Sequence, residues 1–71
     1  MNRDKVASNL KELRQKKGLT QTEMAEILGI STAAWSMYEN GRRIPRDDMK
    51  VQIAKYFNRT VQTIFFKQST H

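Results

Sequence analysis

The chain of 71 residues is the size of one small domain, and its lack of cysteine excludes disulfides, cysteine-ligated zinc and thiol catalysis. It has neither a long apolar run nor a signal-peptide pattern, so we expect no membrane span. The 13 Lys and Arg residues exceed the 7 Asp and Glu residues, and the net charge of +6 favours an anionic partner. Charge alone leaves nucleic acid, an anionic membrane and a merely basic soluble protein all open.

The first predicted helix runs from about Asp4 to Lys17. Val6, Leu10 and Leu13 follow the i, i+4, i+7 spacing and form one apolar stripe on it. Gly18 then ends this helix.

The second predicted helix opens at Thr20, where Thr20 and Glu23 have the spacing of a capping box. Gly29 stops this helix. The link from Gly29 to Ser31 is so short that the next helix must turn sharply, and two helices joined in this way form a helix-turn-helix unit.

The third predicted helix begins after Ser31 and ends before Gly41, with Trp35 and Tyr38 packed inward. Its opposite face is small and uncharged, whereas an ordinary solvated helix would carry Lys and Glu. Short side chains suit the major groove of DNA, where they hydrogen-bond to base edges or contact thymine methyl groups. A weakly decorated surface is the plain alternative. The outer face consists of Thr32, Ala33, Ser36, Met37 and Asn40.

A basic loop, Gly41 to Pro45, follows and leads to a fourth helix from about Arg46 to Phe57. Met49, Ile53 and Phe57 are expected on its inner face. A fifth helix is capped near Thr60. It contains Val61, Ile64 and Phe65, and Phe66 adds apolar surface behind it. The chain therefore reads as all-α.

The stretch from Leu19 to Pro45 closely resembles the lambdoid repressor/Cro helix-turn-helix family, also called the XRE family, and the match extends over about residues 6–66. This resemblance implies an all-α, compact five-helix bundle containing a helix-turn-helix, the lambda repressor-like DNA-binding domain. It also implies one domain over residues 1–71, with the third helix as the recognition helix. The matching segments are Leu10–Arg14, Leu19–Ser31, Trp35–Gly41, Pro45, Ile53–Phe57 and Val61–Phe65.

The resemblance also implies a set of site residues. Gln21, at the start of the second helix, is expected to hold a DNA phosphate. Arg14 and Glu39 match a partly buried ion pair, which we interpret as structural. The residues expected to meet base edges are Thr32, Ala33, Ser36 and Met37, and those expected on the DNA backbone are Asn40, Arg42 and Arg43, together with Gln21.

By the same resemblance, the chain is expected to be a cytoplasmic, sequence-specific regulator that binds double-stranded DNA. A repressor of the Cro type acting as a homodimer on a palindromic operator fits best. The expected dimer contacts are Ile64, Phe65 and Phe66. Since Ile64 and Phe65 can simply close the core, Phe66 is the sharper prediction.

The recognition face departs from the family pattern, because relatives often carry Gln, Arg or Lys there. Thr, Ala, Ser and Met suit single hydrogen bonds and thymine methyl groups, so part of the specificity is expected to come from DNA shape. Ile27 stands where relatives usually have a polar residue, and it is either a partner contact or a scattered apolar group.

An enzyme is not expected. The one histidine is His71, near the C-terminus, and no metal cluster, glycine-rich phosphate loop or acid–base carboxylate pair is evident. No cofactor or small-molecule ligand is expected either. The alternative function is an antitoxin-like protein-interaction module that also binds its own promoter. Membrane-surface binding is disfavoured, because the basic residues are spread over several helices and a loop.

Overall fold

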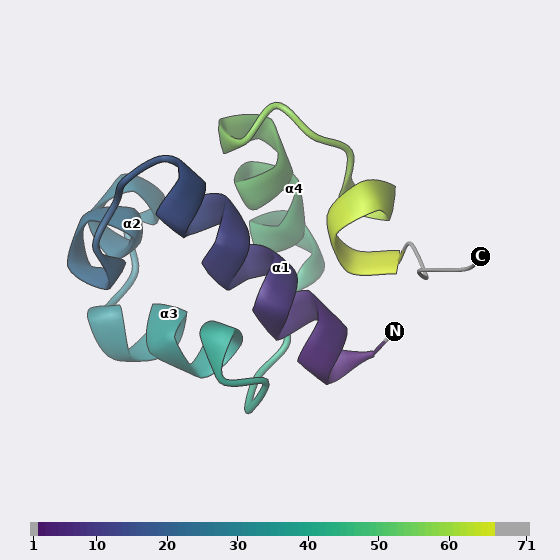
Figure 1. The fold of residues 1–71 in the computed structure, drawn as a ribbon, viewed down its shortest axis with the longest axis horizontal. Helices are drawn as coiled ribbons and strands as arrows, with labels where there is room; N and C mark the ends of the chain where they lie inside the picture. Colours follow the sequence, from purple (N-terminus) through teal and green to yellow (C-terminus); the bar gives the residue numbers. More distant parts are fainter. Residues whose placement is uncertain (1, 67–71) are drawn as a thin grey trace.

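The computed structural model describes residues 2–66, which form four α-helices and a final π-helical turn (Figure 1). The predicted all-α, five-helix architecture is confirmed. No helix within these residues has both the length and the apolar character needed to cross a membrane. His71 lies outside the described residues. The elements are α1 (Arg3–Lys16), α2 (Gln21–Leu28), α3 (Thr32–Glu39), α4 (Asp47–Tyr56) and η1 (Gln62–Phe66).

Side-chain caps decide where the first three helices begin. Asn2 Oδ1 accepts the backbone N–H of Lys5, so α1 starts one residue earlier than predicted. At α2 the capping box is complete: Thr20 Oγ1 accepts the N–H of Glu23 at 3.0 Å, and Glu23 Oε1 accepts the N–H of Thr20 at 2.8 Å. Ser31 caps α3 by accepting the N–H of Ala34. Because each cap satisfies a donor that the helix cannot, these boundaries are set locally.

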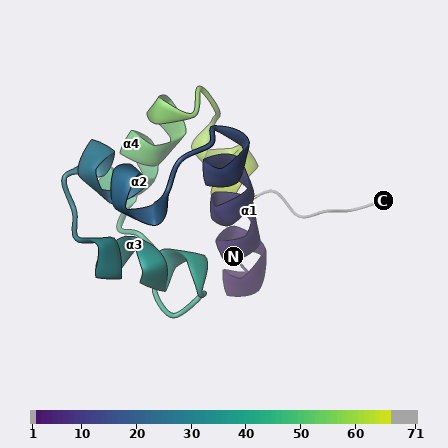
Figure 2. The ribbon, with the colours of Figure 1, turned by 60° about the vertical axis from the view of Figure 1, so that its left-hand side comes forward.

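The sharp turn between α2 and α3 depends on Gly29. This residue has φ 71°, in the left-handed region that other residues adopt only with strain. Its N–H bonds back to carbonyls of the last turn of α2, and the N–H of Ile30 bonds to the carbonyl of Ala25. The helix therefore ends within three residues of the next N-cap, and α3 packs across α2 (Figure 2).

The core is built around Trp35, Leu10, Met24 and Ile53, which are fully buried. The inward faces predicted for α1, α3 and α4 are thus largely confirmed, although Leu13 and Met49 are only half-buried. α1 crosses the molecule in Figure 1 and packs against both α3 and η1, so the first and last elements meet. A buried tryptophan on α3 anchors the candidate recognition helix from behind.

The C-terminal helix is present where it was expected, but its turn is wider than an α-helix. Thr60 Oγ1 caps it by accepting the N–H of Thr63. The carbonyl of Ile64 accepts a hydrogen bond from the Asn9 side chain of α1 at 3.0 Å. Ile64 and Phe65 are both buried. Packing two consecutive large side chains into the core, with a carbonyl bound to another helix, favours the wider turn over local helix propensity.

Candidate nucleic-acid interface

The outer face of α3 lies on the surface, on the side away from Trp35. Thr32, Ala33 and Asn40 are exposed, and Ser36 and Met37 are half-buried. None of the five carries a charge. Asn40 Nδ2 lies 3.4 Å from Ser36 Oγ, one turn along the helix. In Figures 1 and 2 α3 lies at the lower edge of the molecule, together with the loop that follows it and the start of α1.

The start of α2 lies beside the start of α3. The Thr32 hydroxyl is 3.4 Å from the Thr22 hydroxyl, which brings Thr22 to the edge of the predicted base-reading face. Sequence analysis did not single out Thr22, although its place one residue after Gln21 on a first helical turn was a usable signal. Among residues 2–66, the backbone N–H groups of Gln21 and Thr22 donate to no acceptor. Free N–H groups and the positive end of the helix dipole suit a phosphate.

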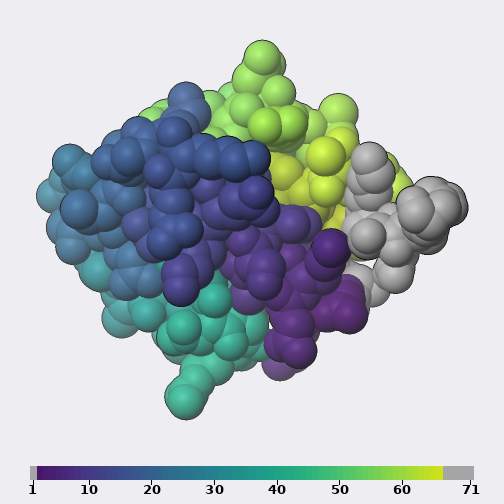
Figure 3. Space-filling model, viewed as in Figure 1, coloured from purple at the N-terminus to yellow at the C-terminus, as the bar shows by residue number. Residues whose placement is uncertain are grey.

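The basic loop continues the same surface beyond the end of α3. The N–H of Arg42 bonds to the carbonyl of Met37, which fixes this arginine against the last turn of the helix. The side chains of Arg42 and Arg43 are exposed, and neither forms an ion pair with any of residues 2–66. Figure 3 shows this loop projecting at the lower edge of the molecule. Two unpaired guanidinium groups beside an uncharged face can bind phosphates on either side of a groove.

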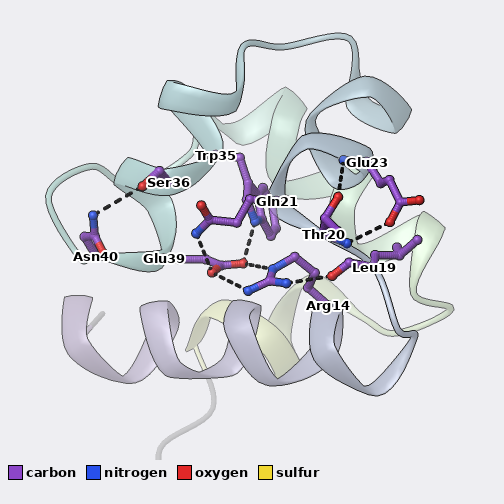
Figure 4. A network of polar contacts seen from close by, with 9 residues as sticks. All are labelled: Arg14, Leu19, Thr20, Gln21, Glu23, Trp35, Ser36, Glu39 and Asn40. Atoms are coloured by element: carbon purple, nitrogen blue, oxygen red, sulfur yellow. Dashed lines mark hydrogen bonds and ion pairs between the residues drawn. The ribbon is translucent and has the colours of Figure 1, made fainter.

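Behind this surface, Glu39 gathers a network of hydrogen bonds from three helices (Figure 4). Arg14 donates to both carboxylate oxygens, at 2.6 and 3.1 Å. The Gln21 amide donates to the carboxylate at 3.0 Å, and the Trp35 indole N–H donates at 2.5 Å. Arg14 also donates to the carbonyl of Leu19 at 2.6 Å. The network therefore ties α1, the linker before α2, and α2 itself to the last residue of α3.

The ion pair of Arg14 and Glu39 is largely shielded, with side-chain exposures of 11% and 2%. Burial by itself raises the pKa of Glu39, but the hydrogen bonds from Arg14, Gln21 and Trp35 outweigh it and hold the pKa below its ordinary value. The hydrogen bond to Glu39 raises the pKa of Arg14 despite partial burial. Both groups are therefore ionised at neutral pH, and the pair holds the helices together rather than facing a ligand.

The three candidate dimer contacts lie in two different environments. Ile64 and Phe65 belong to the core, with exposures of 3% and 2%, because the wide turn of η1 directs both inward. Only Phe66, with 42% of its surface exposed, is available to a second copy. Ile27 is also exposed, at 44%, on α2.

One buried charge was missed by sequence reasoning. Lys50 of α4 is only 7% exposed. Its ammonium group lies 3.3 Å from Asp47 and above the rings of Phe65 and Phe66. Lys50 follows Asp47 by one helical turn, and two aromatic residues come later on the last helix. This pattern was a sequence signal for the ion pair, but it was not a signal that Lys50 is buried.

The fold and the surface together define a helix-turn-helix domain of the lambda repressor type. Residues 10–64 match the model of the helix-turn-helix family HTH_3, and the chain belongs to this family. The resemblance to the lambdoid repressor/Cro family is thereby confirmed. The expectation that the chain is not an enzyme agrees with this membership, since HTH_3 is a helix-turn-helix family and the similar protein ImmR is named a transcriptional regulator.

Three relatives illustrate the similarity. The ImmF control region 10 kDa protein of Bacillus phage phi105 is 41% identical over 54 residues, which are 76% of this chain and 60% of that protein. The HTH-type transcriptional regulator ImmR of Bacillus subtilis is 40% identical over 53 residues, covering 75% of this chain and 42% of ImmR. Antitoxin PezA of Streptococcus pneumoniae is 40% identical over 53 residues, covering 75% of this chain and 34% of PezA. The chain thus spans between about a third and three fifths of these relatives.

Solved structures share the architecture. The SOS-response transcriptional repressor LexA from Eubacterium rectale superposes with a TM-score of 0.88 at 25% identity, covering 97% of this chain and 73% of that one. A transcriptional regulator from Listeria innocua superposes with a TM-score of 0.81 at 25% identity, covering 93% and 63%.

Proposed function

We propose that this chain is a sequence-specific, double-stranded DNA-binding regulator of transcription, a repressor of the Cro type that acts as a dimer on a palindromic operator. The observation that carries the proposal is the uncharged outer face of α3. It lies between N–H groups of α2 and arginines of the basic loop that have no partner among residues 2–66. The similarity to the transcriptional regulator ImmR and to the phage control-region protein supports it. Because its ligand would be chromosomal or phage DNA, we also propose a cytoplasmic location.

In this proposal α3 enters the major groove and Thr32, Ala33, Ser36 and Met37 meet base edges. Hydroxyl groups make single hydrogen bonds, and the apolar tips of Ala33 and Met37 contact thymine methyl groups. Such contacts discriminate weakly, so sequence-dependent DNA shape supplies part of the specificity. Phosphate contacts from Gln21, Asn40, Arg42 and Arg43 then set the register of α3 in the groove without reading sequence.

A single domain of this size makes few base contacts, and a dimer doubles them. A twofold dimer places its two α3 helices in successive major grooves, about 34 Å apart. Phe66 is the contact proposed for the second copy, because it is exposed whereas Ile64 and Phe65 are buried.

The test is selection from a random duplex library at near-physiological salt, followed by sequencing of the bound fraction. The proposal expects an enriched palindrome with half-site centres about 10 base pairs apart. Enrichment of a single, non-repeated site would contradict the dimer but keep sequence-specific binding. Recovery of unenriched DNA would contradict sequence-specific recognition altogether.

A second candidate function is an antitoxin-like module that binds both a protein toxin and its own promoter. The similarity to antitoxin PezA favours it, and the exposed Ile27 offers an apolar contact outside the DNA-facing surface. Co-expression with the product of the neighbouring gene, followed by size-exclusion chromatography, tests it. A stable complex that Ile27→Asp disrupts would favour this function, and separate elution of the two proteins would contradict it.

A further inference from the structure

The side chain expected to hold a phosphate is already engaged inside the protein. Gln21 Nε2 donates to Glu39 Oε1 at 3.0 Å, although the two residues are 18 positions apart in the chain. Figure 4 shows the Gln21 side chain lying over the Glu39 carboxylate, between α2 and α3. Gln21 is half-buried, so part of its side chain remains accessible.

The chemistry of the two groups fixes the orientation of the amide. An ionised carboxylate only accepts hydrogen bonds, so the NH₂ end of Gln21, and not its carbonyl, must face Glu39. The terminal torsion of a glutamine is otherwise broad and nearly two-fold, and either end could turn outward. Glu39 uses one of the two amide hydrogens and leaves the other for a second acceptor.

Glu39 is itself held firmly. Its carboxylate accepts from Arg14 and Trp35 as well as from Gln21, and its side chain is almost completely buried. A carboxylate that is already fixed by Arg14, by Trp35 and by packing loses little further freedom when it orients Gln21.

We propose that Glu39 is a positioning residue for DNA binding, which orients the Gln21 amide so that its second N–H meets a phosphate oxygen. This inference rests on the proposed function. It extends that function by giving the Glu39 carboxylate a role in DNA binding, although this carboxylate does not touch the DNA.

Simple electrostatics and the proposed orienting role predict opposite changes in DNA affinity when Glu39 loses its charge. Removing a negative charge near a polyanion strengthens binding, because repulsion is lost and Arg14 is left unpaired. If Glu39 instead orients Gln21, the variant Glu39→Gln weakens binding, because the new amide offers donors as well as acceptors and Gln21 is free to turn. The sign of the change therefore separates the two accounts.

The experiment measures dissociation constants for a fluorescein-labelled duplex of about 24 base pairs, long enough for two half-sites about ten base pairs apart. It uses the wild type, Glu39→Gln, Gln21→Ala and the double variant, at low salt and at a temperature where circular dichroism shows each to be folded. We expect each single variant to bind about five- to tenfold more weakly, the worth of one hydrogen bond. The double variant should bind no more weakly than Gln21→Ala.

The matched control is Glu12→Gln, which makes the same chemical change. Glu12 forms an exposed ion pair with Lys16 on α1, outside the network. We expect its affinity to equal that of the wild type or to be slightly higher. Unchanged or tighter binding by Glu39→Gln, or additive losses in the double variant, would overturn the inference.

A measurement on the wild type keeps the test independent of how well the Glu39 variant folds. The two side-chain amide protons of Gln21 should give separate NMR signals, and adding duplex should shift one of them much more than the other. Equal shifts, or none, would overturn the inference. A wild type that binds no duplex would instead overturn the proposed function, and the inference with it, so the two failures are distinguishable.

Discussion

The ammonium group of Lys50 lies 5.2 Å from the centroid of the Phe66 ring, although the lysine is buried and the ring is 42% exposed. A cation over an aromatic ring is attracted by the negative face of that ring. One face of Phe66 is thus occupied by a residue of α4, while part of the ring stays exposed on the surface.

Phe66→Ala should weaken self-association without unfolding the domain. The exposed ring contributes little to the core, but burying it against a second copy would remove apolar area from water. Sedimentation equilibrium should show a dimer dissociation constant at least about tenfold higher than that of the wild type, since an aromatic anchor is worth roughly 2 kcal/mol. The control is Ile27→Ala, an equally exposed residue on α2. Equal dissociation constants for both variants would remove Phe66 from the interface.

Trp35→Ala should destabilise the domain by roughly 3–5 kcal/mol, because it removes a fully buried aromatic side chain. The ring also packs edge-to-face on Tyr38, with centroids 5.9 Å apart. Urea unfolding followed by circular dichroism measures the loss. Trp35→Phe keeps most of the packing but lacks the N–H that donates to Glu39. Its smaller loss in the free energy of unfolding therefore separates the contribution of packing from that of the hydrogen bond. A Trp35→Ala protein that unfolds at the wild-type midpoint would contradict the observed burial.

The stability contributed by Glu39 should depend on pH. Its pKa in the folded protein is below the ordinary value, so the folded state binds a proton less readily than the unfolded state. The contribution is therefore fully present above the unfolded pKa of about 4.3 and is lost as the pH falls through the lower folded pKa.

Urea unfolding at several pH values compares the wild type with Glu39→Gln. At pH 7 the wild type should be more stable by roughly 3 kcal/mol, the cost of breaking a buried pair, and this difference should shrink below about pH 4. Glu12→Gln, in an exposed pair, serves as the control and should show little difference at any pH. A Glu39→Gln difference that stays constant from pH 7 to about pH 3 would contradict the shift in pKa.

Arg42→Ala should weaken binding to all duplexes alike. A phosphate contact releases about one counterion, so the slope of log affinity against log salt should become shallower by about one unit. The control is Lys55→Ala, which removes the same charge from the last turn of α4, on the side away from the basic loop in Figures 1 and 2. If both variants change the slope equally, the effect is one of net charge and not of a contact at Arg42.

Substitutions at Ser36 and Met37 should change which sequences are bound. Both lie on the outer face of α3 and are half-buried, so Ser36→Ala and Met37→Ala should leave the unfolding midpoint nearly unchanged. Each substitution should weaken the sequence preference at one or two base pairs of the selected motif. The expected loss of discrimination against the wrong base is about 1–3 kcal/mol per base pair. Identical motifs from the wild type and both variants would exclude this face from base reading.

Much of the fold could be predicted from local sequence. The capping box at Thr20, the N-cap at Ser31 and the stop at Gly29 all appear in the structure, because a cap or a left-handed glycine acts on backbone groups within four residues. The apolar spacing likewise identified Trp35, Leu10 and Ile53 as core residues. The uncharged face of α3 was visible for the same reason, since helical periodicity alone places its members together.

Other features required the tertiary structure. The contacts of Gln21 with Glu39, Thr22 with Thr32 and Asn9 with Ile64 join residues that are 18, 10 and 55 positions apart. Whether such pairs meet depends on the angles at which helices cross, and these angles are set by the packing of all the facing side chains at once.

The sequence by itself thus determined the helices, most of their ends, most of the core and the family. Only the tertiary structure decided that Lys50 is buried over two aromatic rings, that Ile64 and Phe65 face inward on a widened turn, and that the Gln21 amide is oriented by Glu39. The physical reason is range: caps and periodicity act within one or two turns of a helix, whereas burial and hydrogen bonding between helices depend on which surfaces the whole chain brings together.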